Sequence, residues 1–216
     1  PSPEAMMQDA LATLPPISLY QDVSSTNDLA MQGARQGAPH GSCWVADRQL
    51  QGRGRRQHDG QARSWFSPLA KNLYFSLLIK HSLPPELVST LTLAAAVGAW
   101  RTLDPLLSPH QERLLVKWPN DLYIAHRKLG GILSEGVMLH NRLDAVIVGV
   151  GLNINLLEGD LPDDLRGAAT SLAIATGLTT HDRLAITHAL REQILLASEQ
   201  LHRLGLPYII SQLEPI

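Results

Sequence analysis

The chain has 216 residues, a formal net charge of −2 and 44% hydrophobic residues, which is typical of a globular protein with a single domain. The near-neutral charge disfavours broad binding to nucleic acid or to a membrane surface. The single cysteine, Cys43, excludes an intramolecular disulfide, and no apolar run reaches the roughly 18 residues of a membrane span. We therefore expect a cytoplasmic protein. Because the histidines lack metal-ligand spacing, no dedicated metal site is predicted.

The first half of the chain predicts strands and helices in alternation. The cap-type residues 24–27 precede a helix through about Arg35. A second helix is predicted over residues 86–103, because Glu86 suits a first turn and apolar residues recur on one face. Strand patterns occupy three segments: residues 17–23, 42–47 and 72–80.

The second half predicts hairpins followed by helices. Gly149 and Gly151 interrupt an apolar strand and indicate close approach of a ligand or of another chain segment. A short helix near residues 171–175 and a long amphipathic one over 182–204 follow. The predicted strands are residues 114–118, 122–125, 128–137 and 145–154. This order predicts an α+β fold, a single domain over residues 1–216 with a mixed, largely antiparallel sheet covered by helices.

Positive charge is concentrated in one glycine-containing segment. Residues 51–56 read QGRGRR, and the segment from Arg48 to Arg63 contains five arginines but only one acidic residue, Asp59. Glycine lets main-chain N–H groups approach a ligand, and arginine presents planar donors that match phosphate or carboxylate. The segment therefore favours one specific anionic ligand, although a solvated Arg-Gly loop is an open alternative.

Four segments stand out together: Ser-Thr-Asn at 25–27, GRGRR at 52–56, KWPND at 117–121 with RKLGGILSE at 127–135, and GVGLNIN at 149–155. In this order and spacing they resemble the catalytic domain of biotin–protein ligases, over about residues 17–210. The resemblance implies a fold like that of class II aminoacyl-tRNA synthetases. It also implies activation of biotin with ATP and magnesium, and transfer of biotin to a lysine of a biotin carboxyl carrier domain.

The resemblance implies a biotin site near the start of the first helix. Ser25, Thr26 and Asn27 would contact biotin, whose neutral ureido ring suits hydroxyl and amide groups. Gln49 would meet the same ring. The alternatives are a helix N-cap for the first three residues and an ordinary surface glutamine for the last.

The resemblance also implies which charged residues act on the reacting groups. Arg53, Gly54 and Arg55 match a loop that folds over biotin and its adenylate. Lys128 matches a lysine that reaches the reacting carboxylate and phosphate, with Gly131 beside biotin. Lys128, Arg53 and Arg55 would be catalytic, because their charge offsets repulsion between a carboxylate and the phosphate that it attacks.

The residues implied for ATP come from several segments. Trp65 would lie near adenine, where ring stacking is reasonable, and Asn153 would contact the nucleotide, with a buried strand end as the alternative. Asp121 could orient a donor, help to hold magnesium, or serve only in a turn. The full predicted set is Arg55, Arg56, Trp65, Lys117, Asn120 and Asn153.

Two departures from the family pattern affect these expectations. Residues 57–64 form an insertion before Trp65, and we expect this segment to become ordered over the ligands. No helix-turn-helix precedes residue 17, so repressor activity is not expected. The sequence also has no SH3-like barrel after the last helix, which fits either a shortened chain or a protein without that barrel. The functional alternatives are a lipoate or octanoate ligase or transferase with an elongated acyl channel, a non-catalytic biotin-binding module, and nucleic-acid binding through the arginine loop.

Overall fold

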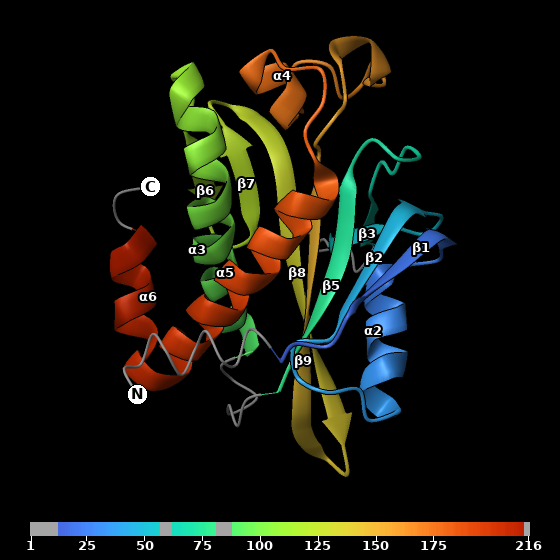
Figure 1. Ribbon diagram of the computed structural model, residues 1–216, viewed down its shortest axis with the longest axis vertical. Helices are drawn as coiled ribbons and strands as arrows, with labels where there is room; N and C mark the ends of the chain where they lie inside the picture. Colours follow the sequence, from blue (N-terminus) through green and yellow to red (C-terminus); the bar gives the residue numbers. More distant parts are fainter. Residues whose placement is uncertain (1–12, 57–61, 81–87, 214–216) are drawn as a thin grey trace.

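The computed structural model describes residues 13–56, 62–80 and 88–213. Its centre is a seven-stranded sheet with the order β1-β2-β5-β9-β8-β7-β6 (Figure 1). The strands are β1 (Ile17–Val23), β2 (Cys43–Gln49), β5 (Leu73–Ile79), β6 (Leu114–Lys117), β7 (Asp121–Ile124), β8 (Arg127–Leu139) and β9 (Arg142–Leu152). Strands β1 and β2 are parallel, whereas the other neighbouring pairs are antiparallel. The predicted mixed, largely antiparallel sheet is confirmed.

Helices cover both faces of this sheet. Helices α3 (Val88–Leu107) and α5 (Arg183–Leu204) pack together on one face, and α2 (Thr26–Arg35) lies on the other (Figure 1). The close approach of α3 to α5 requires Gly98, because a Cβ there would lie 2.7 Å from the backbone nitrogen of Ile194. No helix in the described ranges is long and apolar enough to cross a membrane.

Alternation along the strands explains why both faces are covered. On β9, Val146, Val148 and Val150 pack under α3 and α5, whereas Ala145 and Ile147 pack under α2. Successive side chains of a strand point to opposite faces, so a nearly continuous apolar strand needs cover on both sides. Helix α2 has only 10 residues and leaves one end of its face open.

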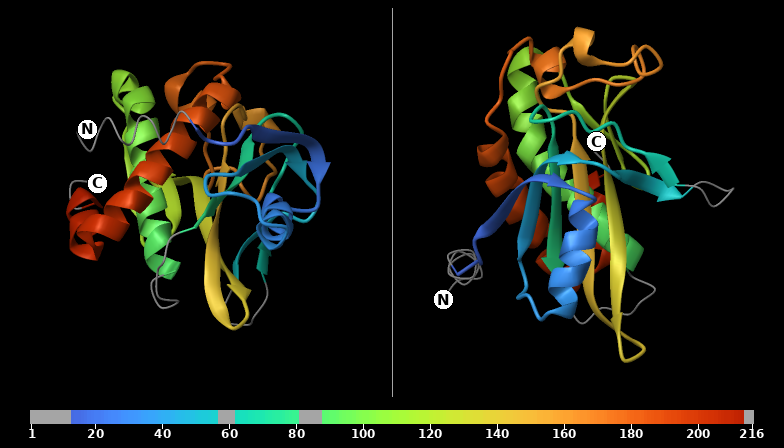
Figure 2. Two further views of the ribbon diagram at one scale, coloured as in Figure 1. Left: turned by 60° about the horizontal axis from the view of Figure 1, so that its bottom comes forward. Right: turned by 90° about the vertical axis from the view of Figure 1, so that its right-hand side faces the viewer.

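The remaining elements were not all expected. Strands β3 (Arg53–Arg56) and β4 (Ala62–Ser64) form a separate hairpin that projects from the main sheet (cyan, right-hand view of Figure 2). Of the inserted segment 57–64, residues 62–64 form β4 and residues 57–61 lie outside the described residues, so its ordering over ligands stays a prediction. The other elements are the 3₁₀ turns η2 (Ser108–His110) and η3 (Glu158–Asp160), and the helices α4 (Leu172–Thr176) and α6 (Leu206–Leu213).

Several predicted boundaries were wrong by a few residues. Helix α3 continues to Leu107 instead of ending at 103, because buried Leu107 completes its apolar face. Its predicted start at Glu86 lies outside the described residues. Strand β9 begins at Arg142 instead of 145, because the β8–β9 hairpin extends past the sheet (Figure 1). Helix α6 had no sequence prediction.

Candidate active site

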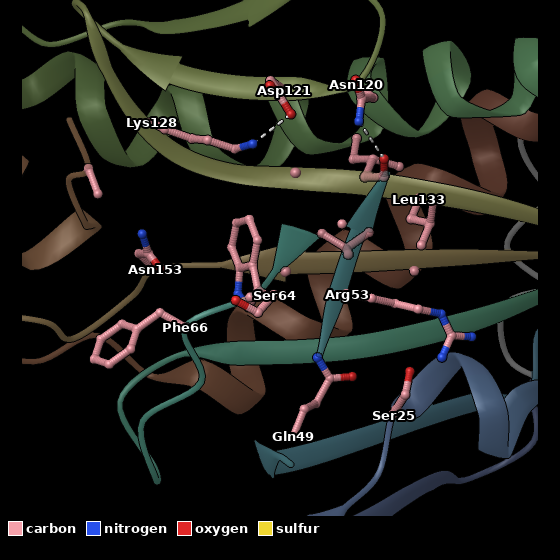
Figure 3. A pocket seen from close by; sticks show the side chains of 18 of the residues that line it. Ser25, Gln49, Arg53, Ser64, Phe66, Asn120, Asp121, Lys128, Leu133 and Asn153 are labelled. Carbon is pink, nitrogen blue, oxygen red and sulfur yellow. Dashed lines mark hydrogen bonds and ion pairs between the residues drawn. The ribbon is translucent and has the colours of Figure 1, made fainter. Parts of the chain in front are cut away.

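A pocket of about 540 Å³ lies on the face that α2 leaves open (Figure 3). Its floor includes Gly149 and Gly151, which follow Ile147 on the same side of β9. Where Ile147 fills the space under α2, the two glycines leave it free. The close approach that the sequence predicted at these glycines is confirmed: a Cβ on Gly149 would collide with the Asn27 amide, and one on Gly151 would lie 3.2 Å from the Trp65 indole.

Uncharged polar side chains form one end of the pocket, which we call the polar end: Ser25, Thr26, Asn27 and Gln49. The backbone nitrogen and the hydroxyl of Thr26 both donate to Gln49 Oε1, at 2.9 and 3.1 Å. Since Oε1 has two partners, the Gln49 amide is held in one orientation. Figure 3 shows its nitrogen directed into the pocket, where it can donate to a ligand.

Ser25 stands at the N-cap position of α2 without capping the helix. Its backbone is extended, as an N-cap residue requires, but its side chain makes no capping hydrogen bond. The side chain is nearly buried and lines the pocket, with its hydroxyl directed inward (Figure 3). The structure therefore places Ser25 as a pocket residue more than as a cap.

Arg53 lies at the rim beside this polar end and is held by acids. Its guanidinium donates to both carboxylate oxygens of Asp28, at 2.6 and 3.2 Å, and lies 3.7 Å from Glu135. The hydrogen bond to Asp28 raises the pKa of Arg53 above its usual value. Gly54 also lines the pocket. The backbones of Arg55 and Arg56 belong to β3, but their side chains lie outside the described part of the chain.

Lys128 enters the pocket from the start of β8. Its ammonium contacts Asp121 Oδ1 at 2.8 Å and lies 5.5 Å from the ring centroid of Trp65. Gly131 lies beneath this pair, because a Cβ there would be 3.5 Å from Asp121 Oδ1 and 3.8 Å from Lys128 Cε. A side chain at 131 would crowd the space in front of the ammonium.

The opposite side of the pocket is apolar. Residues 157–169, which we call the wall loop, close it with four side chains that sequence reasoning missed: Leu161, Leu165, Ala168 and Ala169. Phe66 completes this surface (Figure 3). The segment is rich in charged residues, which gave no signal of an apolar lining, so only the three-dimensional structure identifies it. Trp65 lies nearby, and its buried Nε1 has no acceptor among the described residues, as expected where a ligand supplies one.

The wall loop is hydrogen-bonded to β8 at Lys128. The backbone nitrogen of Lys128 donates to Ala168 O at 2.8 Å, and Thr170 N donates to Lys128 O at 2.9 Å. Next to it, the Arg127 guanidinium donates to Ala169 O at 2.8 Å and to both carboxylate oxygens of Glu158, at 2.6 and 3.1 Å. The position of this wall therefore depends on residues 127 and 128.

The remaining predicted nucleotide residues differ in their placement. Asn120 lines the pocket and donates to Ile132 O at 3.2 Å. Asn153 also lines it, but its amide accepts from Asn72 Nδ2 at 3.0 Å and donates to Thr170 O at 3.0 Å, so its side chain also serves the fold. Lys117 is exposed outside the lining, with its ammonium 5.4 Å from the Tyr123 ring centroid. A role for Lys117 near ATP stays a prediction.

Within the described ranges, no group of three His, Cys, Asp or Glu side chains could hold a metal ion. Asp121 is the acidic residue of the pocket lining, and Lys128 already contacts it. Such a site can accommodate a magnesium ion that is carried mainly by phosphate oxygens, but it offers no protein cage for one.

Comparisons with known proteins agree with this architecture. Residues 19–153 match the model of the biotin/lipoate A/B protein ligase family. The bifunctional ligase/repressor BirA of Bacillus spizizenii is 36% identical over 186 residues, which cover 86% of this chain and 53% of that protein. A biotin–[acetyl-CoA-carboxylase] ligase of Mycobacterium tuberculosis is 28% identical over 180 residues, 82% of this chain and 62% of that protein. The chain thus spans about half to two thirds of these relatives.

A solved structure extends the similarity to the fold. The biotin protein ligase of Aquifex aeolicus in complex with biotin and ATP superposes with a TM-score of 0.76 and 27% identity, over 92% of this chain and 77% of that one. The match to the family model covers more than half of the sequence and includes most of the residues that line the pocket. The chain therefore belongs to the biotin/lipoate A/B protein ligase family.

Proposed function

We propose that this chain is the catalytic domain of a biotin–protein ligase. It would join biotin to ATP as biotinyl-5′-adenylate and transfer biotin to a lysine of a biotin carboxyl carrier domain. One observation carries the proposal: a single pocket has an uncharged polar end, an apolar wall opposite, and Lys128 between Asp121 and Trp65. The names of the relatives and the biotin–ATP complex of the Aquifex aeolicus enzyme support it.

The polar end favours biotin over a lipoyl or octanoyl group. A ureido ring is neutral and has both donors and an acceptor, so it can use the Gln49 nitrogen and the Ser25 hydroxyl. An octanoyl chain or a dithiolane ring would leave these polar groups unpaired, which discriminates strongly against such ligands. Adenine would lie against the apolar wall formed by Phe66 and the wall loop.

In the first step, a biotin carboxylate oxygen bonds to the α-phosphorus of ATP, and the bond to the pyrophosphate oxygen breaks. The negatively charged carboxylate and α-phosphate repel each other. The positive charge of the Lys128 ammonium offsets this repulsion and stabilises the negative charge that moves to the leaving group. Magnesium would accompany the ATP phosphates and neutralise part of their charge. Asp121 holds Lys128 in place before the substrates bind.

In the second step, the amine of the carrier lysine attacks the acyl carbon of the adenylate. The bond to the phosphate oxygen breaks, AMP leaves, and the amine loses a proton to give an amide. No side chain of this protein needs to form a covalent intermediate. Buried Cys43 is consistent with this, because burial raises the pKa of its thiol to about 12.

Mass spectrometry after mixing with ATP and magnesium tests the proposal directly. Biotin should yield biotinyl-adenylate, whereas lipoate and octanoate should yield none. Lys128→Ala is the control variant: it should bind biotin nearly as wild type does but form adenylate about 10²-fold more slowly, the scale for losing one transition-state charge contact. If biotin neither bound nor formed an adenylate, the proposal would be wrong.

A further inference from the structure

Glu135 lies beside the polar end of the pocket without lining it. It belongs to the RKLGGILSE motif, pairs with Ile147 across β8 and β9, and is half-buried. Its Oε2 accepts a hydrogen bond of 2.5 Å from Asn27 Nδ2. Asn27 itself is buried and lines the pocket. Glu135 therefore contacts a residue predicted to bind biotin without itself lining the pocket.

We propose that Glu135 is a positioning residue for biotin, which acts by fixing the orientation of the Asn27 amide. A carboxylate only accepts hydrogen bonds, so the Asn27 atom that faces it must be the amide nitrogen. The oxygen of the amide must then point the other way, where the Ser76 hydroxyl donates to it at 2.5 Å. This inference rests on the function proposed above.

The buried Ser76 hydroxyl lies between the two halves of the polar end. Its hydrogen goes to Asn27, and its oxygen lies 2.8 Å from Thr26 Oγ1, whose own hydrogen goes to Gln49 Oε1. Glu135 and Ser76 thus fix Asn27, and Thr26 fixes Gln49, so both amides keep one polarity before a ligand arrives. A preorganised set of donors loses less free energy on binding than one that must reorient.

Glu135 also contacts Arg53, but this ion pair is longer than the one between Arg53 and Asp28. Arg53 lies 3.7 Å away, but it makes two shorter hydrogen bonds to Asp28, so its position does not depend on Glu135. The two possible roles differ in what they need. Orientation of Asn27 needs an acceptor at 135, charged or not, whereas attraction of Arg53 needs a negative charge.

Glu135→Ala and Glu135→Gln separate these roles. Glu135→Ala removes the acceptor and should weaken biotin binding about tenfold or more, the scale for a buried donor left without its partner. The ATP KM and kcat at saturating biotin should change little. Glu135→Gln keeps an acceptor oxygen and should bind biotin nearly as wild type does. Asp144→Ala removes an exposed carboxylate from the neighbouring strand β9 and is the matched control, with wild-type binding expected.

A double-mutant cycle with Asn27→Ala tests whether Glu135 acts through Asn27. If it does, adding Glu135→Ala to Asn27→Ala should weaken biotin binding no further. Binding would be measured by calorimetry on variants that melt cooperatively. If Glu135→Ala does not fold, Glu135→Met, which keeps the volume but accepts no such bond, takes its place.

Three results would overturn the inference: equal losses in Glu135→Gln and Glu135→Ala, losses that add to that of Asn27→Ala, or biotin binding by Glu135→Ala at the wild-type level. In each case wild type would still bind biotin and form its adenylate, so the proposed function would stand. Failure of the wild-type protein to bind biotin would overturn both.

Discussion

Replacing Gly149 by alanine should weaken biotin binding while sparing ATP. The glycine lies under the side chain of Asn27, and a Cβ there would collide with the amide oxygen and come within 3.0 Å of the nitrogen. The two hydrogen bonds that hold this amide, from Ser76 and to Glu135, are each 2.5 Å long. No rearrangement of the amide keeps both bonds once the methyl group is present, so Asn27 must leave its position.

The size of the effect follows from these two bonds. A neutral hydrogen bond contributes about 1 kcal/mol net and one to a charged group about 2 kcal/mol. Losing both amounts to about 3 kcal/mol, or roughly a hundredfold in the biotin Kd. Part of this energy can appear as lower protein stability instead, because overpacking a core typically costs about 1–3 kcal/mol.

Calorimetric titration with biotin measures the change, and two other glycines provide comparisons. Gly136→Ala adds a methyl group to β8, where it meets only the tip of Leu143 at 3.0 Å and a Val88 methyl at 3.8 Å, so binding should be unchanged. Gly151→Ala, two residues from Gly149, presses on the Trp65 indole at 3.2 Å and should raise the ATP KM instead. If Gly149→Ala bound biotin like wild type, the placement of Asn27 in the biotin site would be refuted.

Two further predictions concern the wall loop and alkaline pH. Arg127→Ala removes the hydrogen bonds to Ala169 O and Glu158, and it should raise the ATP KM several-fold without affecting biotin binding. Arg166→Ala, at an exposed arginine of the wall loop, is the control and should keep the wild-type ATP KM. Equal ATP KM values for the two variants in steady-state kinetics would contradict the role of Arg127. Burial raises the pKa of Cys43 from 9.0 to about 12 and that of Tyr74 from 10.0 to about 12. Between these pH values the folded state keeps protons that the unfolded state loses. The contribution of the two groups to the free energy of unfolding is therefore full below about pH 9 and is lost as pH rises toward 12. Urea unfolding at pH 8, 10 and 11 should show falling stability, less steeply in Cys43→Ser, and a flat profile would refute the prediction.

The sequence was most informative where local pattern and tertiary packing agree. The strand at 17–23 was predicted with its observed bounds, since the cap-type residues 24–27 mark its end. The apolar run that Gly149 and Gly151 interrupt predicted a strand and a close approach at these two glycines, and both glycines line the pocket. Most residues of the predicted site line one pocket. The order and spacing of the four motifs together predicted this set, which no single motif could have done.

What sequence reasoning missed depends on contacts between distant segments. The wall loop has no regular apolar period, and its role appears only where Ala168 and Thr170 bond to the backbone of Lys128. Likewise, the bond between the amides of Asn153 and Asn72, 81 residues apart, had no signal in the sequence, although Asn153 also lines the pocket. The periodicity of apolar residues indicates which side chains are buried, but not which distant residues they bond to. Such hydrogen-bonded pairs therefore cannot be derived from a single sequence.

The hydrogen bond between Asn27 and Glu135 joins residues 108 positions apart, and Ser76 reaches Asn27 across 49. Closing such long loops is entropically expensive, so these contacts form only after β5 has paired with β9 and α2 has docked on them. A half-folded chain would have the β8–β9 hairpin but no polar end. A ligand that binds there recognises only the complete fold, and mass action then stabilises the whole molecule by RT ln(1 + [L]/Kd). Saturating biotin should therefore slow amide hydrogen exchange deep in β5 and β9, far beyond the residues that it contacts.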